Sequence, residues 1–236
     1  MLACGNDHFI VGAMDDKILR RLWELGIPTF SMESGLTTGD FGWGSPTFHK
    51  MGRQKINLIG YFTEMGFDIL LTDVDTVWMR DPLPFIERYP DADVLTSSDH
   101  LTNTTTGESL ERWPQAGGAA NIGIMLFRCT EGSKELAKEW AQVLEKNDKI
   151  WDQNAFNDLF RKGAKNLANG MHEYSLPLPA SVSCLTGNCF PADERHLFMA
   201  YHGRIKMGIF GVGTFLSGHT FFVQRMHQKM NVDPYV

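Results

Sequence analysis

The sequence predicts an α/β protein with a doubly wound, mostly parallel sheet flanked by helices, and a smaller mixed β region near the C-terminus. Short apolar runs of strand length alternate with longer segments of helical periodicity along most of the chain. Turn signals, such as the glycines within residues 34–45, separate these segments. With 236 residues, 43% of them hydrophobic, the chain is long enough to bury one sizeable core. We therefore expect a single domain over residues 1–236.

Helix signals set two boundaries in the first part of the chain. Gly26 ends the first predicted helix, because glycine readily adopts the left-handed conformation that closes a helix. Ser45 and Pro46 open the second, as an N-cap and a first-turn proline. The elements expected here are a strand over 9–13, a helix over 15–25, a strand over 28–32, a loop over 34–45, a long helix from 46 and a buried strand over 69–72.

The rest of the chain continues the alternation and ends in shorter segments. Asp152 is expected to cap a helix that ends at Phe160. The other elements expected are strands over 94–97 and 122–127, a helix over 133–145, and short strands over 204–210 and 220–223.

Lys55 falls on the apolar stripe of the second predicted helix, four residues after Met51 and three before Leu58. In one interpretation its aliphatic stem packs while its amine reaches water. In the other, the amine points toward the edge of the sheet and meets an anion. Position alone favours neither interpretation.

Asp73 and Asp75 follow directly after the buried strand over 69–72. In open α/β sheets, ligands bind outside the carboxyl ends of the strands. In extended backbone, residues two apart point to the same side, so these carboxylates would form an oxygen-rich site for Mn²⁺ or Mg²⁺. Such a cation neutralises charge on a departing nucleoside diphosphate. The alternative is an ordinary solvated turn at a strand end.

Haloacid-dehalogenase-like phosphatases share the D-x-D-x-[TV] pattern, with the first aspartate as nucleophile and the second as general acid/base. Asp73 and Asp75 fit that pattern. The phosphatase motif normally stands on the first strand and is followed by a lysine and a paired-acid motif. Here the only Asp-Asp pair, Asp15-Asp16, precedes the motif. A phosphatase is therefore an alternative that fits less well.

Five segments carry a resemblance to the nucleotide-diphospho-sugar transferases of glycosyltransferase family 77. They contain the sequences TTGDFGWGSPTF, LTDVDTVWMRDP, NIGIMLFR, WDQNAF and SGHTFFVQ, at residues 37–48, 71–82, 121–128, 151–156 and 217–224. The extensin arabinosyltransferase branch of this plant and algal family looks closer than the xylosyltransferase branch.

This resemblance implies a GT-A fold and a UDP-sugar donor carrying arabinose, xylose or galactose. It also implies Mn²⁺ or Mg²⁺ as cofactor, retention of anomeric configuration, and a glycan or hydroxyproline-rich glycoprotein as acceptor. Retaining transfer needs no strong protein base, since the leaving-group phosphate can take the acceptor proton. The location implied is the Golgi lumen, in a type II membrane protein.

The same resemblance assigns roles to particular residues. It implies that Asp73 and Asp75 of the D-x-D bind the metal ion. It also implies that the start of the helix at 152 faces the anomeric carbon of the donor sugar. The donor-binding residues implied are Lys55, Asp73, Asp75, Gly118, Asn121, Gly123 and His219, and the catalytic candidates are Asp152 and Gln153. Each implied role has a purely structural alternative. In that alternative the glycines only form a loop that enters a strand, Asp152 and Gln153 are only an N-cap and a surface amide, and His219 is a structural histidine.

Composition excludes some classes of function. The net charge of −6 and the lack of a basic cluster argue against a nucleic-acid surface. No run of eighteen apolar residues occurs, so nothing in this chain is expected to span a membrane. Cys184 and Cys189 are either loop thiols or a local disulfide, and Asn103-Thr104-Thr105 is a glycosylation sequon.

The chain also departs from the family pattern. A preceding strand, a signal anchor and a late histidine that would serve as a third metal ligand are missing from it. We therefore expect a domain truncated at both ends. A non-catalytic, truncated domain that binds through the same cleft is a second alternative function.

Overall fold

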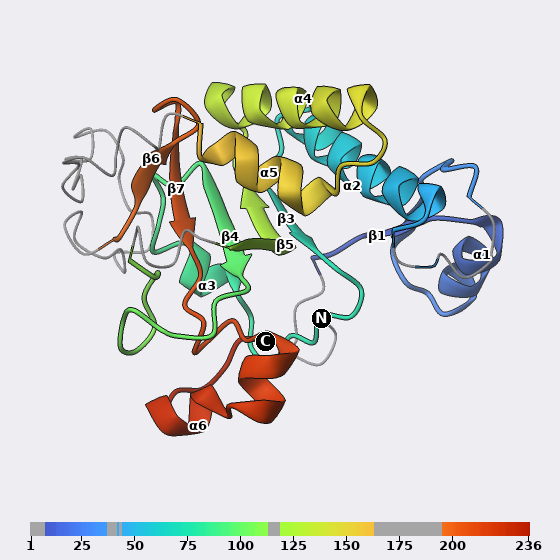
Figure 1. Ribbon diagram of the computed structural model, residues 1–236. Helices are drawn as coiled ribbons and strands as arrows, with labels where there is room; N and C mark the ends of the chain where they lie inside the picture. Colours follow the sequence, from blue (N-terminus) through green and yellow to red (C-terminus); the bar gives the residue numbers. More distant parts are fainter. Residues whose placement is uncertain (1–7, 37–41, 43, 113–118, 163–194) are drawn as a thin grey trace.

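The computed structural model describes residues 8–36, 42, 44–112, 119–162 and 195–236 (Figure 1). In chain order the elements are β1 (Val11–Ala13), α1 (Asp16–Glu24), β2 (Thr29–Ser31), α2 (Pro46–Glu64), β3 (Ile69–Thr72), α3 (Leu83–Ile86), β4 (Val94–Ser98), β5 (Ala120–Phe127), α4 (Glu131–Lys146), α5 (Asp152–Phe160), β6 (Phe198–Ala200), β7 (Ile205–Ile209), the π-helix η4 (His219–Val223) and α6 (Met226–Met230). None of the described helices is both long enough and apolar enough to cross a bilayer.

The central sheet is mixed, with strand order β3-β5-β4-β7-β6. Only β4 and β7 pair in parallel, and the other neighbours are antiparallel. A separate parallel pair joins β1 to β2. The prediction of a mostly parallel sheet is therefore wrong, although the α/β class is confirmed. Parallel neighbours need a crossover connection, usually a helix, and the described part of the β4–β5 connection contains none.

β3 and β4 flank β5 and are both antiparallel to it. These two strands consequently run in the same direction, and their carboxyl ends meet one edge of the sheet. Asp73 follows β3 and Asp99 follows β4 at this edge. The topology thus brings two carboxylates together that are far apart in the sequence.

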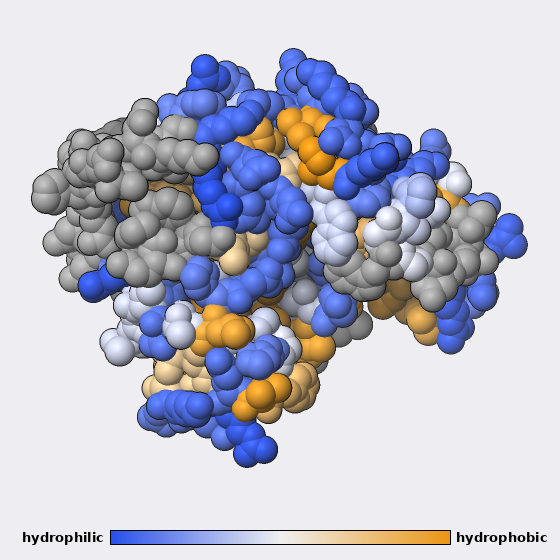
Figure 2. All heavy atoms as spheres, viewed as in Figure 1, coloured by the Kyte–Doolittle hydropathy of each residue, from blue (hydrophilic) through white to orange (hydrophobic). Residues whose placement is uncertain are grey.

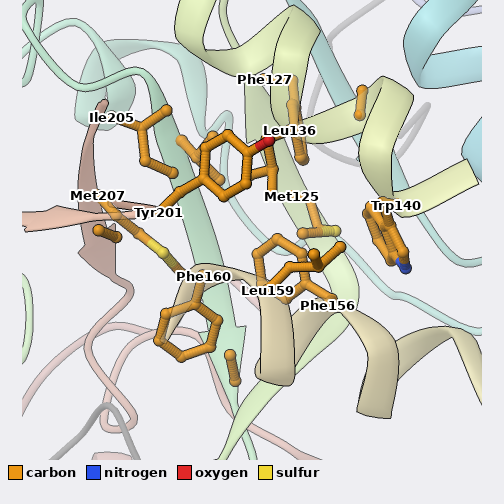
Figure 3. Close-up of a cluster of buried hydrophobic side chains, with 14 of the residues drawn as sticks. Met125, Phe127, Leu136, Trp140, Phe156, Leu159, Phe160, Tyr201, Ile205 and Met207 are labelled. Carbon is orange, nitrogen blue, oxygen red and sulfur yellow. The ribbon is translucent and has the colours of Figure 1, made fainter. Parts of the chain in front are cut away.

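Apolar side chains cover both faces of the sheet. On one face, α2, α4 and α5 lie together (Figure 1). Their side chains pack against Met125 and Phe127 of β5, with Trp140 and Phe156 fully buried between helices and sheet (Figure 3). On the other face, Phe85 of α3 packs in a second cluster with residues of the C-terminal segment. Burial on two faces explains why the strands appear as continuous apolar runs in the sequence.

β5 carries an irregularity next to the edge that holds Asp73. Its pairing with β4 jumps from Thr96 opposite Met125 to Ser97 opposite Asn121. As a result Ile122 and Met125 face the same core cluster although they are three residues apart. Such bulges interrupt the regular ladder and redirect side chains.

Two of the helix boundaries predicted from capping residues, at Ser45 and Gly26, are confirmed. Ser45 caps α2 by accepting a hydrogen bond from the Phe48 amide, and Gly26 adopts φ +68° after α1. One strand prediction is wrong, because residues 220–223 form η4 instead of a strand. There the Phe-Phe-Val run favours a strand by composition, but two of its side chains, Phe222 and Val223, are 75% and 69% exposed. Among the described residues no strand pairs with this segment, and local hydrogen bonds close a helical turn.

Candidate active site

The backbone turns immediately after β3, which changes how the D-x-D is presented. The Thr76 amide donates to the Asp73 carbonyl, 3.1 Å away, so residues 73–76 form a turn and the extended backbone expected here is not found. Val74 is 97% exposed at the tip of this turn. The Asp73 amide still donates to the Gly123 carbonyl of β5, at 2.8 Å, which holds the start of the turn at the sheet edge.

Lys55 projects from α2 toward this edge. Its Nζ lies 2.5 Å from Asp73 Oδ1 and 2.8 Å from the Ile122 carbonyl oxygen, and its side chain is only 16% exposed. The ammonium group therefore meets an anion at the sheet edge and does not extend into water. The carbonyl that it binds belongs to Ile122, which has no partner on β4 in the irregular part of the β4–β5 pairing. The lysine thus provides a hydrogen bond to this backbone group.

Asp73 is held in a mixed electrostatic environment. Partial burial raises the pKa of this carboxyl, the Lys55 ammonium opposes that increase, and repulsion from Asp75 and Asp152 adds to it. Two further carboxylates thus act on Asp73 beside one lysine. A bound cation would relieve this repulsion, and carboxylates are the ligands that Mn²⁺ and Mg²⁺ prefer.

Asn121 and Gly123 lie on β5 next to Asp73. The Gly123 amide donates to Asn121 Oδ1 at 2.7 Å. A Cβ at position 123 would lie 2.9 Å from Asn121 Oδ1 and 3.4 Å from Asp73 Oδ2. Glycine at 123 therefore allows the two polar side chains to approach the same stretch of backbone.

Asp152 and Gln153 begin α5, which also meets the backbone of Ile122. Gln153 Oε1 accepts a hydrogen bond from the Ile122 amide at 3.3 Å. The expectation that Asp152 caps the helix is wrong, because the N-cap is Trp151 and Asp152 is the first helical residue. Its Oδ1 instead accepts from the Gln153 amide at 2.8 Å.

Gly52 brings α2 against the start of α5. A Cβ at this buried position would lie 2.7 Å from Asp152 Oδ2 and 3.0 Å from its Cγ. Glycine is ordinarily unfavourable inside a helix, by roughly 0.5–1 kcal/mol relative to alanine. Here the missing side chain makes room for the Asp152 carboxylate.

We expect Gly52→Ala to lower the free energy of unfolding by about 1–3 kcal/mol, because the clash outweighs the gain in helix propensity. Gly60→Ala is the matched control in the same helix, since a Cβ there meets nothing within 4 Å. It should raise the free energy of unfolding by about 0.5–1 kcal/mol. Urea unfolding measures both variants, and stabilisation by Gly52→Ala would contradict the packing described.

Asp99 is a site residue that the sequence analysis did not assign. Its Oδ1 accepts from Asn121 Nδ2 at 2.7 Å, and its Oδ2 accepts from Gln153 Nε2 at 2.8 Å. The available signal was a carboxylate just after a predicted strand, which is also the position of Asp73. With Asp99 included, contacts run in series through Lys55, Asp73, Gly123, Asn121, Asp99, Gln153, Asp152 and Gly52. Gly52 and Lys55 lie three residues apart on α2, which closes the series into a ring.

Two predicted site residues that the structure describes, Asp75 and His219, do not join this ring. His219 is exposed in η4, and among the described residues no three His, Cys, Asp or Glu side chains converge as metal ligands. His219 is therefore not placed with the D-x-D aspartates. Gly118 lies outside the described residues, as do Cys184 and Cys189.

Comparison with known proteins identifies the family. The sequence profile of the nucleotide-diphospho-sugar transferases matches residues 4–235. The chain therefore belongs to the nucleotide-diphospho-sugar transferase family, and the resemblance to glycosyltransferase family 77 is confirmed.

Its relatives are plant enzymes. The arabinosyltransferase XEG113 of Arabidopsis thaliana is 45% identical over 228 residues, which cover 97% of this chain and 32% of the relative. UDP-D-xylose:L-fucose alpha-1,3-D-xylosyltransferase 1 of the same plant is 26% identical over 162 residues, covering 65% of this chain and 43% of the relative. The chain thus spans less than half the length of either protein. No solved structure matches it.

Proposed function

We propose that this chain is a metal-dependent glycosyltransferase domain that moves a sugar of the arabinose, xylose or galactose class from a UDP-sugar to a hydroxyl group. The observation that supports this most is the Lys55–Asp73 pair at the sheet edge, with Asp75 in the same turn. A cation and two carboxylates at this edge suit a diphosphate and its metal ion.

Asp73 and Asp75 would hold the metal ion, Mn²⁺ or Mg²⁺. The fit rests on the chemistry of their oxygens, on the 45% exposure of the Asp73 side chain and on the exposed position of Asp75. Diphosphate oxygens would complete the coordination, since the described residues supply no third ligand of the usual type. When bound, the ion neutralises negative charge on the departing UDP.

The chain's own residues orient the donor around that charge. Lys55 acts as a point charge toward phosphate, while Asn121 and the open backbone at Gly123 lie beside the sugar. Asp152 and Gln153 face the anomeric carbon from the start of α5. We propose that transfer retains the anomeric configuration and that the leaving phosphate oxygen accepts the proton of the attacking hydroxyl.

The acceptor and the location are further parts of the proposal. We propose a glycan or a hydroxyproline-rich glycoprotein as acceptor. Two relatives are named for arabinosyl transfer and for xylosyl transfer to L-fucose, which supports a sugar acceptor. We propose the Golgi lumen as the compartment in which the full-length protein acts.

A transfer and hydrolysis assay tests this function. With Mn²⁺, the chain should release UDP from one of UDP-arabinofuranose, UDP-xylose or UDP-galactose, and chelation with EDTA should stop the reaction. UDP binding without turnover, for all three donors and with glycan acceptors present, would instead support the non-catalytic binding domain.

The phosphatase alternative loses its support, because the chain belongs to a transferase family and Lys55 precedes the D-x-D in the sequence. The same assay checks it with a phosphomonoester. Phosphate release that disappears in Asp73→Asn would contradict the transferase proposal.

A further inference from the structure

A single exposed carboxylate, that of Asp99, connects β5 to α5. One oxygen accepts from the side-chain amide of Asn121 and the other from the side-chain amide of Gln153, at 2.7 and 2.8 Å. Asp99 itself follows β4, so three elements meet at this group. Both of its amide partners are residues to which the proposed function gives a place beside the sugar.

The oxygen of each side-chain amide accepts a hydrogen bond from a backbone amide of β5. Asn121 Oδ1 accepts from the Gly123 amide at 2.7 Å, and Gln153 Oε1 accepts from the Ile122 amide at 3.3 Å. A side-chain amide has an acceptor end and a donor end, which are exchanged when it rotates by half a turn. Rotation of either amide would place N–H against a backbone N–H and turn an oxygen toward the Asp99 carboxylate.

The orientation of both amides is therefore fixed from two sides, and Asp99 supplies the acceptor that both donor ends require. We propose that Asp99 is a positioning residue for sugar transfer: it sets the rotamers of Asn121 and Gln153 so that both keep one orientation at the anomeric carbon. This inference rests on the proposed function for the reaction itself, but the hydrogen-bond arrangement stands without it.

Only an ionised carboxylate can satisfy both contacts. Asparagine at position 99 has nearly the same shape but offers one acceptor and one donor, so its donor end would oppose an N–H of one partner. The partner cannot rotate away without losing its backbone contact. Asp99→Asn therefore disturbs amide orientation with little change in volume.

The first arm of the test is kinetic. Asp99→Asn should lower kcat about 10- to 100-fold while KM for the donor changes less than about twofold, because misorientation at the reacting centre affects the transition state most. Asp68→Asn is the matched control. Asp68 precedes β3, at the strand end away from Asp73, and also accepts two hydrogen bonds, from Arg128 and the Cys129 amide. An unchanged kcat in Asp99→Asn, or an equal loss in Asp68→Asn, would overturn the inference.

The second arm needs no activity and uses the side-chain NH₂ signals of Asn121 and Gln153 in ¹H–¹⁵N spectra of the full chain. Both pairs should shift in Asp99→Asn and stay in place in Asp68→Asn. In the double variant Asp99→Asn/Asn121→Asp, the new amide at 99 donates to the new carboxylate at 121 and still accepts from Gln153. The Gln153 signals should then return toward their original positions.

The two arms separate the two claims. A wild-type chain that transfers no sugar contradicts the proposed function, and the amide signals then decide the positioning role alone. Amide signals that are unchanged in Asp99→Asn overturn the positioning role even when the wild-type chain is active.

Discussion

Asp75→Ala should abolish Mn²⁺-dependent binding of UDP. Asp75 is exposed in the turn after β3, and its charge already acts on Asp73. Its loss would leave a single carboxylate to hold a divalent ion against water, and the affinity that depends on the metal would disappear. Isothermal titration of UDP with and without Mn²⁺ measures the effect.

The control for Asp75→Ala is Asp148→Ala, which removes the same charge from another exposed position between α4 and α5. It should leave UDP affinity within about twofold of the original value, as expected of a distant surface charge. Metal-dependent UDP binding that survives Asp75→Ala would exclude this residue as a ligand, whatever the other carboxylates do.

Lys55→Met should weaken UDP binding about 10- to 100-fold. A hydrogen bond to a charged group contributes about 1.5–3 kcal/mol, and the ammonium is the described cation in direct contact with Asp73. The methionine keeps most of the apolar stem of the lysine and removes its charge. Because the Asp73 side chain is 45% exposed, the variant should lose only about 1 kcal/mol of the free energy of unfolding.

Lys162→Met is the matched control for this variant. Lys162 Nζ lies 2.6 Å from Glu139 Oε1 in a surface pair whose side chains are 40% and 34% exposed. Its loss should leave UDP affinity unchanged and cost about 0–1 kcal/mol of stability. If Lys55→Met bound UDP as well as Lys162→Met does, the phosphate role of Lys55 would be wrong.

The sequence could predict the parts of the fold that depend on local signals. Ser45, Gly26 and the apolar runs of β3 to β5 set element types and boundaries with little reference to the rest of the chain. Strand direction does not depend on local signals. The connection between β4 and β5 decides it. A strand buried on both faces, such as β5, appears as a continuous apolar run, and this pattern does not indicate whether the strand is parallel or antiparallel.

The candidate site was predictable to the same extent. The position of Lys55 on α2 and of Asp73 after β3 follow from periodicity, and the structure joins them. The turn at residues 73–76 is closed by one local hydrogen bond. The role of Asp99 depends on contacts made where the β4–β5 register is irregular, at Asn121 and beside the Ile122 backbone. Such a register shift arises from tertiary packing and leaves no pattern in the sequence.

The surface of the chain also carries apolar patches. Figure 2 shows a mostly hydrophilic face with separate hydrophobic patches, one of them over the η4–α6 segment. Phe222 and Val223 of η4 are among the exposed apolar side chains. These side chains are apolar, whereas the contacts around Asp73 are made by charged and polar groups.

The most direct test of a metal–diphosphate site at the D-x-D is paramagnetic broadening of amide signals by Mn²⁺ in the presence of UDP, with Mg²⁺ and UDP as the diamagnetic reference. The strongest broadening should fall on the amides of Val74 and Asp75 in the turn and of Gly123 on β5, while those of β6, at the edge of the sheet farthest from β3, should broaden least. Broadening centred on another acidic surface, such as Glu135 and Glu139 of α4, would contradict the assignment.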